Sequence, residues 1–135
     1  MKKLLALLLI LAVTMSAVAI AEYPLSENEQ KYVGAWNMYI DNGEGTVYVF
    51  ITTFLDNYQV IQRSMTFKNG VQTSDNKATG SWSGFTEDSI LFTLAGTGMA
   101  ATIKDDGFLY MYFFEDMKLC GIFASCPDMR EKLGW

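Results

Sequence analysis

The sequence predicts an all-β fold, either a small antiparallel up-and-down β-barrel or a bent meander of about eight strands. Residues 31–123 break into short runs rich in β-branched and aromatic residues, a composition typical of strands. Turn sequences such as Asn69-Gly70 and Asp105-Asp106-Gly107 separate these runs. No long stretch has the 3.6-residue period of an amphipathic helix. Regular short strands with short connections favour an antiparallel meander closed into a barrel.

The expected elements follow one another with short turns between them. A capping box formed by Ser26 and Glu29 predicts a brief helix before the first strand. A polar segment, 72–79, is expected to lead into GSWSGF at 80–85. The stretch 115–123 is expected to turn at its start and form the last strand. The remaining expected strands are 33–40, 46–54, 58–67, 89–96, 99–104 and 108–114.

The N-terminus has the layout of a secretory signal. Two lysines precede a long apolar run that ends in small residues, and we expect cleavage after Ala21. The alternative is an uncleaved membrane anchor, because the run from Leu4 to Ile20 has 17 residues and reaches the lower limit of about 17–25 for a spanning helix. No cysteine lies near the cleavage site, which argues against a lipoprotein. The expected organisation is a signal at 1–21, a linker or short helix at 22–30, a barrel at 31–123 and a tail at 124–135. The protein is therefore expected to be secreted or associated with the cell envelope.

Charge and composition exclude several classes of function. Without the signal, 8 basic residues face 15 acidic ones, a net charge of −7, which disfavours nucleic acid and anionic membranes. The sequence contains no histidine, which removes the commonest general base and transition-metal ligand. The acidic turns, DNGEG at 41–45 and KDDG at 104–107, lack the spacing of a calcium loop and have the composition of ordinary turns. We therefore expect no catalytic activity, no cofactor and no metal.

Two cysteines lie close together near the C-terminus. Cys120 and Cys126 would close a small loop, and an even pair in an exported chain predicts a disulfide. The alternative is two separate thiols, one in the core and one exposed.

A Gly-x-Trp motif opens the first expected strand and recurs later in the chain. Gly34-Ala35-Trp36 and Gly80-Ser81-Trp82 each precede a loop and a strongly β-forming strand. A tryptophan at such a strand start can plug the end of a barrel while its N–H finds a carbonyl. The motif and strand rhythm over most of residues 31–123 resemble small secreted lipocalin-like domains of Gram-positive gut bacteria.

This resemblance implies a cup for a small apolar molecule. Lipocalins often place a basic residue over the tryptophan, a position that Arg63 or Arg130 could take. The chain is short for a full lipocalin, and a small barrel can be filled by its own side chains. The residues expected to line the cup are Trp36, Phe50, Phe92, Tyr110 and Tyr112.

Two functional hypotheses follow from these observations. The first is a secreted, non-enzymatic protein that binds a small apolar molecule. The alternative is a structural or interaction domain of the cell surface, whose filled core supports an exposed aromatic face that binds a protein or a glycan. The aromatic strand residues serve equally as pocket lining or as plain core, so the sequence leaves both open.

Overall fold

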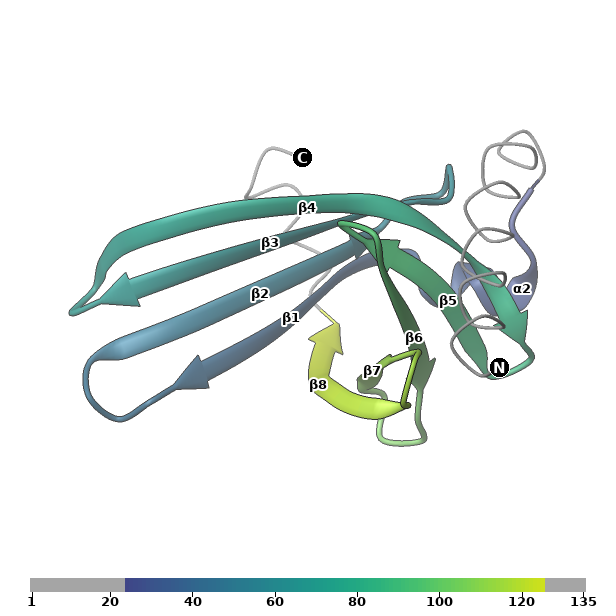
Figure 1. The fold of residues 1–135 in the computed structure, drawn as a ribbon. Coiled ribbons are helices and arrows are strands. Elements are labelled where there is room, and N and C mark those ends of the chain that lie inside the picture. Colours follow the sequence, from purple (N-terminus) through teal and green to yellow (C-terminus); the bar gives the residue numbers. More distant parts are fainter. Residues whose placement is uncertain (1–23, 126–135) are drawn as a thin grey trace.

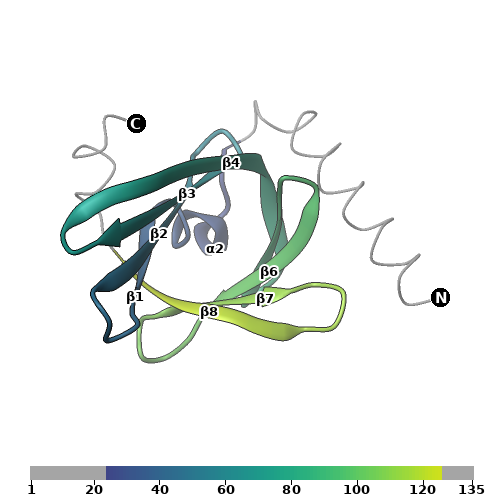
Figure 2. The same cartoon turned by 60° about the vertical axis from the view of Figure 1, so that its left-hand side comes forward.

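The computed structural model describes residues 24–125, in which eight antiparallel strands close into a barrel. The predicted all-β barrel is therefore confirmed (Figures 1 and 2). Each strand pairs with the next in the chain, and β8 returns to β1 through the pairs Ser125–Trp36 and Ala124–Asn37. The elements are α2 (Glu27–Gln30), β1 (Gly34–Asp41), β2 (Thr46–Phe54), β3 (Gln59–Lys68), β4 (Val71–Thr86), β5 (Ser89–Leu94), β6 (Thr97–Ile103), β7 (Leu109–Phe113) and β8 (Lys118–Ser125).

Strand β4 is longer than the sequence suggested. The polar segment 72–79 is part of the strand and pairs with β3, so its description as a lead-in is wrong. From Trp82 onward β4 pairs with β5 instead, and it curves over the barrel between these two partners (Figure 1). Its polar residues are mostly exposed, because β3 and β4 extend beyond the packed part of the barrel. A strand solvated on both faces lacks the apolar alternation that reveals strands in sequence.

Gly80 lies where β4 bends from one partner strand to the other. A Cβ atom at this position would lie 1.7 Å from the carbonyl oxygen of Thr93 in β5. The backbone N–H of Ala95 also donates to the carbonyl of Thr79 at this point. Glycine permits this close approach of two backbones because it has no side chain. The glycine of the second Gly-x-Trp motif therefore allows β4 to bend and to change its pairing partner from β3 to β5.

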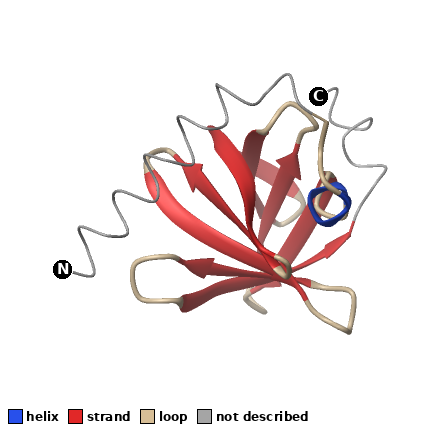
Figure 3. Cartoon of the chain, turned by 90° about the vertical axis from the view of Figure 1, so that its right-hand side faces the viewer, coloured by secondary structure: helices blue, strands red, loops and turns tan. Residues whose placement is uncertain are grey.

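One end of the barrel, which we call the helix end, is closed by α2 and the residues that follow it. The predicted capping box is confirmed, since Ser26 and Glu29 exchange two hydrogen bonds. The hydroxyl of Tyr32 donates to the carbonyl of Asp88 and accepts from the N–H of Ile103. In Figure 2 the strands form a ring with α2 inside its outline, and Figure 3 shows the helix from another side. We call the opposite end, with the turns β1–β2 and β3–β4, the far end.

Both tryptophans of the repeated motif are buried near the helix end. The indole N–H of Trp36 donates to the carbonyl of Tyr32, and that of Trp82 donates to the carbonyl of Leu55, each at 2.9 Å. Phe54 contacts Trp82 and Phe92 edge-on. The prediction that these rings plug the barrel while their N–H groups find carbonyls is confirmed.

Alternate residues of β1–β3 form two clusters on opposite faces of the sheet. The inner cluster contains Trp36 and Phe54, and Met38 and Phe50 pack against it. A smaller cluster on the outer face contains Ala35, Ile51 and Met65. This division follows the period-two alternation of side chains along a strand, so each residue of β1–β3 can be assigned to the inner or outer face.

Candidate functional site

Three rows of side chains cross the inner face of β1–β4 toward the far end. The register of β1–β2 and β2–β3 has no shift, so directly paired residues lie on the same face. From the helix end outward, row 1 is Trp36, Thr52, Gln62 and Ala78; row 2 is Met38, Phe50, Ser64 and Asn76; row 3 is Ile40, Tyr48, Thr66 and Ser74. We call rows 2 and 3 the inner-face site.

Exposure of the side chains increases from row to row. Trp36 in row 1 is 5% exposed, whereas Ile40 and Tyr48 in row 3 are 44% and 38% exposed. Met38 and Phe50 lie between them, half-buried against the core. Figure 1 shows β1–β4 extending well beyond the other strands in this direction. Row 1 thus ends the packed core, and the inner-face site is accessible to another molecule.

The two halves of the inner-face site differ in chemistry. The half on β1 and β2 is apolar, whereas the half on β3 and β4 carries hydroxyl and amide groups. In row 1, the amide of Gln62 donates to the hydroxyl of Thr52 at 2.9 Å. Within residues 24–125, the polar side chains of rows 2 and 3 have no hydrogen-bond partner; these are Ser64, Thr66, Ser74 and Asn76. Hydroxyl and amide side chains of this kind can both donate and accept hydrogen bonds.

Met38 extends from β1 toward β8, the neighbouring strand that closes the barrel. A Cβ atom at Gly121 of β8 would lie 2.5 Å from the Sδ atom of Met38. Glycine at this position therefore makes room for the methionine between β1 and β8. A flexible thioether side chain can adjust to different shapes placed against it.

The structure brings three of the five predicted site residues together. Trp36, Phe50 and Phe92 all belong to or pack on the inner cluster, but Trp36 and Phe92 are buried within it. Only Phe50 lies in the inner-face site.

Tyr110 and Tyr112 lie on the other face of β7. They alternate with Leu109 and Met111, which are buried in the inner cluster. The hydroxyl of Tyr110 donates to Asp106 at 2.7 Å. Because 108–114 is apolar on both faces, its sequence does not reveal which side faces inward.

Sequence reasoning missed Met38, Ile40 and Tyr48. The first two follow Trp36 at intervals of two residues, which is the spacing of one strand face. This signal was present in the sequence. The sequence alone does not show that Tyr48 pairs with Ile40, because that pairing depends on the register of the first hairpin.

Arg63 does not lie over Trp36. It pairs with Ile51 on the outer face, and its Nε donates to Asp75 at 2.8 Å. Arg130, the other residue considered for this role, lies outside the described residues. The guanidinium group of Arg63 therefore pairs with a surface carboxylate and does not contact the indole ring of Trp36.

Cys120 lies in β8 beside the register shift opposite Met111 and Tyr112 and is exposed. Partial burial raises the pKa of its thiol. The described part of the chain contains no disulfide, and Cys126 lies beyond it. The bridge between Cys120 and Cys126 stays a prediction.

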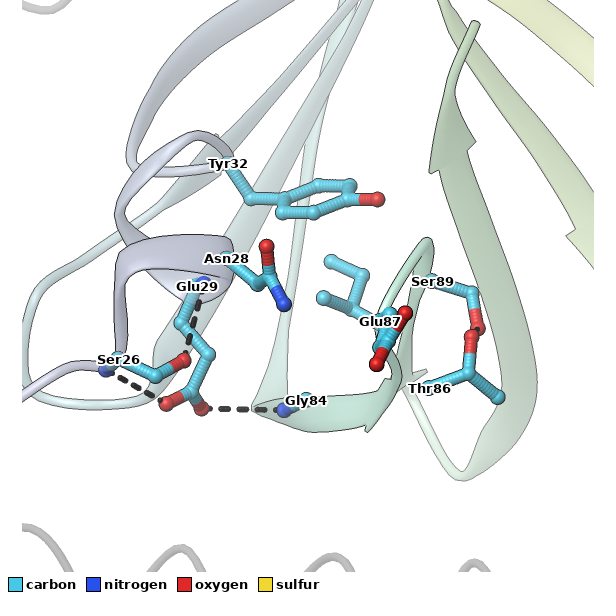
Figure 4. Close-up of a pocket in the computed structure, with 9 residues that line it drawn as sticks. Ser26, Asn28, Glu29, Tyr32, Gly84, Thr86, Glu87 and Ser89 are labelled. Atoms are coloured by element: carbon cyan, nitrogen blue, oxygen red, sulfur yellow. Dashed lines mark hydrogen bonds between the residues drawn. The ribbon is translucent and has the colours of Figure 1, made fainter.

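A hollow lies at the helix end, between α2 and the β4–β5 turn (Figure 4). Its volume of about 190 Å³ is below the range of roughly 300–1,000 Å³ typical of small-molecule sites. The residues that line it are mostly polar: Ser26, Asn28, Glu29, Tyr32, Gly84, Thr86, Glu87, Ser89 and Ile90.

The carboxylate of Glu29 in this hollow joins three elements. One oxygen accepts from the N–H of Ser26 and the hydroxyl of Tyr58, and the other accepts from the N–H of Gly84. Burial alone raises the pKa of Glu29, but these hydrogen bonds outweigh it, and the pKa lies below the ordinary value of 4.5. The carboxylate therefore fastens α2 to the barrel.

Removing this carboxylate is expected to make stability less dependent on pH. A lowered folded-state pKa contributes stability above the unfolded pKa, and this contribution is lost as pH falls through the folded pKa. We expect Glu29→Gln to lower the free energy of unfolding by about 1–3 kcal/mol at neutral pH. The difference from wild type should shrink below the ordinary pKa of 4.5. Urea unfolding across this pH range measures both quantities.

The control is Glu27→Gln in the same helix, because Glu27 is exposed and its side chain makes no hydrogen bond within the described residues. Equal losses from both variants at all pH values would contradict the role of Glu29.

Comparison with protein-family models, curated proteins and solved structures found no match. Among the described residues, no helix has the length and apolarity needed to cross a membrane. The same residues contain no group of three or more cysteine or acidic side chains arranged to hold a metal ion.

Proposed function

We propose that this protein is a non-enzymatic binding protein that takes an apolar molecule into the inner-face site. The observation that carries the proposal is the exposure gradient along the inner face. Apolar side chains that share a face with the core remain half-buried or exposed at the far end, above a filled base. Apolar area of this kind gains roughly 25 cal/mol per Å² when a ligand covers it.

The proposal differs from the cup that the lipocalin resemblance implies. Trp36 and Phe92 would form the base of the site rather than its walls, because both are packed in the core. Phe50 and Met38 would contact the ligand from below, and Tyr48 and Ile40 from the side. The proposed lining therefore keeps Phe50 but replaces Trp36 on β1 with Met38 and Ile40, the next two residues on the same face.

The proposal also includes export, which rests on the signal-like layout of residues 1–21. An extracellular location would favour the bridge between Cys120 and Cys126.

A second candidate function is binding of a protein or glycan partner on an exposed apolar surface. The observation that favours it lies around the β7–β8 turn, where Phe113, Met117 and Leu119 are all exposed. Exposed apolar residues gathered in this way are typical of interaction surfaces.

Two tyrosines on opposite faces of the first hairpin provide the test. We expect Tyr48→Ser to weaken binding of an uncharged solvatochromic dye, Nile red, by about tenfold, because about 1–2 kcal/mol of apolar contact is lost. Tyr39→Ser should leave dye binding unchanged, since Tyr39 is on the outer face and 62% exposed. Fluorescence titration measures both, with thermal unfolding as the check on folding.

Equal dye affinity in the two variants would overturn the proposal. A dye affinity that instead falls on Leu119→Ser would favour the surface around the β7–β8 turn.

A further inference from the structure

We propose that the ligand of the inner-face site is an uncharged amphiphile. Its apolar chain would lie on the β1–β2 half, and its polar headgroup would contact the β3–β4 half. This inference rests on the proposed function and adds the chemical class of the ligand and its orientation.

The apolar half is a continuous strip on two neighbouring strands. Met38 pairs with Phe50, and Ile40 pairs with Tyr48. Directly paired side chains have Cβ atoms about 4.5–5.5 Å apart, and successive rows are separated by about 6.5–7 Å. The strip runs from the half-buried row 2 to the exposed row 3. An apolar chain lying along it would cover the four side chains without entering the filled core.

The polar half supplies hydrogen-bonding groups in matched positions. Ser64 pairs with Asn76, and Thr66 pairs with Ser74. Hydroxyl and amide side chains both donate and accept, so they suit headgroups made of hydroxyls or amides. These four side chains have no partner within residues 24–125, in contrast to Gln62 and Thr52 in row 1. The unused groups therefore share rows 2 and 3 with the apolar strip.

Rows 2 and 3 contain no charged residue. Arg63, Lys77 and Asp75 belong to the same strands but alternate with the row residues, and Arg63 and Asp75 bind each other. A charged headgroup would lose water here without gaining an opposite charge, which disfavours its binding. A neutral headgroup loses less hydration free energy when it binds here.

Two lysines beyond the rows could serve a different ligand. Lys68 at the end of β3 pairs with Thr46 of β2, and Lys118 at the start of β8 pairs with Phe113 of β7. Both are exposed. An anionic amphiphile that used them would have to place its headgroup at the rim instead of on the hydroxyl-bearing half, so the two orientations are experimentally distinct.

Competition among three amphiphiles with twelve-carbon chains and different headgroups tests the inference. Dodecyl maltoside, dodecanoate and dodecyltrimethylammonium, each below its micelle concentration, would displace Nile red from the purified protein. We expect the maltoside to bind at least about tenfold more tightly than either charged probe. The double variant Ser64→Ala, Asn76→Ala should weaken binding of the maltoside about fivefold to tenfold, calculated with the Nile red affinity measured for the same variant. Lys77→Ala, on the outer face beside Asn76, is the matched control.

The outcomes separate the two proposals. If Nile red does not bind, or binds equally to wild type and Tyr48→Ser, the proposed function fails. If Nile red binding depends on Tyr48 but the three amphiphiles bind equally, only the present inference fails. Tightest binding by dodecanoate, with its advantage lost in Lys68→Gln, would also overturn it and place the headgroup at the rim.

Discussion

Replacing Gly80 with alanine is expected to lower the free energy of unfolding by at least about 3 kcal/mol, at the upper end of overpacking effects. The added methyl group would meet the carbonyl oxygen of Thr93 at 1.7 Å, and backbone cannot move aside as a flexible side chain can. Relief requires separating β4 from β5 at the corner of the barrel. Urea unfolding monitored by circular dichroism measures the loss, and failure to fold would agree with it.

Gly84→Ala is the matched control in the same strand. A Cβ atom there would approach the Cγ atom of Glu29 at 3.2 Å, and that neighbour is a side chain that can shift. We expect an effect of about 1 kcal/mol or less. A Gly80→Ala protein as stable as Gly84→Ala would show that the corner does not depend on the absence of a side chain.

The second large effect is expected from Trp82→Ala, which should lower the free energy of unfolding by about 3–5 kcal/mol. The side chain is 0% exposed, and its ring lies against Phe54 and Tyr58. Its loss would leave a cavity at the helix end and would free the carbonyl of Leu55, to which the indole N–H donates. Thermal and urea unfolding measure the change.

Phe85→Ala, three residues further along β4, serves as the comparison. Phe85 is about half exposed and contacts Phe114 edge-on. Its removal should cost about 1 kcal/mol or less. Similar losses from the two aromatic residues would contradict the view that the filled core, and not aromatic content in general, stabilises the barrel.

The barrel was predictable because its strands carry local signals. The turn at Asn69-Gly70, the capping box at Ser26 and the β-branched run 46–54 each agree with the structure. Local propensity, turn composition and apolar pattern point in the same direction in these segments. The exception is 72–79, which forms a strand by pairing with β3 although its own composition is that of a loop.

The candidate site was predictable only in part. Phe50, expected to line a pocket, packs against the inner cluster, whereas Tyr110 and Tyr112 alternate with the residues of β7 that are buried in that cluster. The two tyrosines differ from their neighbours Leu109 and Met111 by one position, and a one-residue slip exchanges the two faces of a strand. Where both faces are apolar, composition does not distinguish them.

The sequence by itself determined the strand content, the turns and the buried role of the two Gly-x-Trp motifs. These features depend on local backbone preference and on the burial of large apolar rings, and both follow from the type of each residue. Tertiary structure alone decided where the packed core ends and which side chains remain accessible above it. That boundary depends on strand register and on the unequal lengths of strands on the two sides of the barrel, such as β4 beside β5. Both are set by pairing between segments distant in sequence, so no local pattern records them.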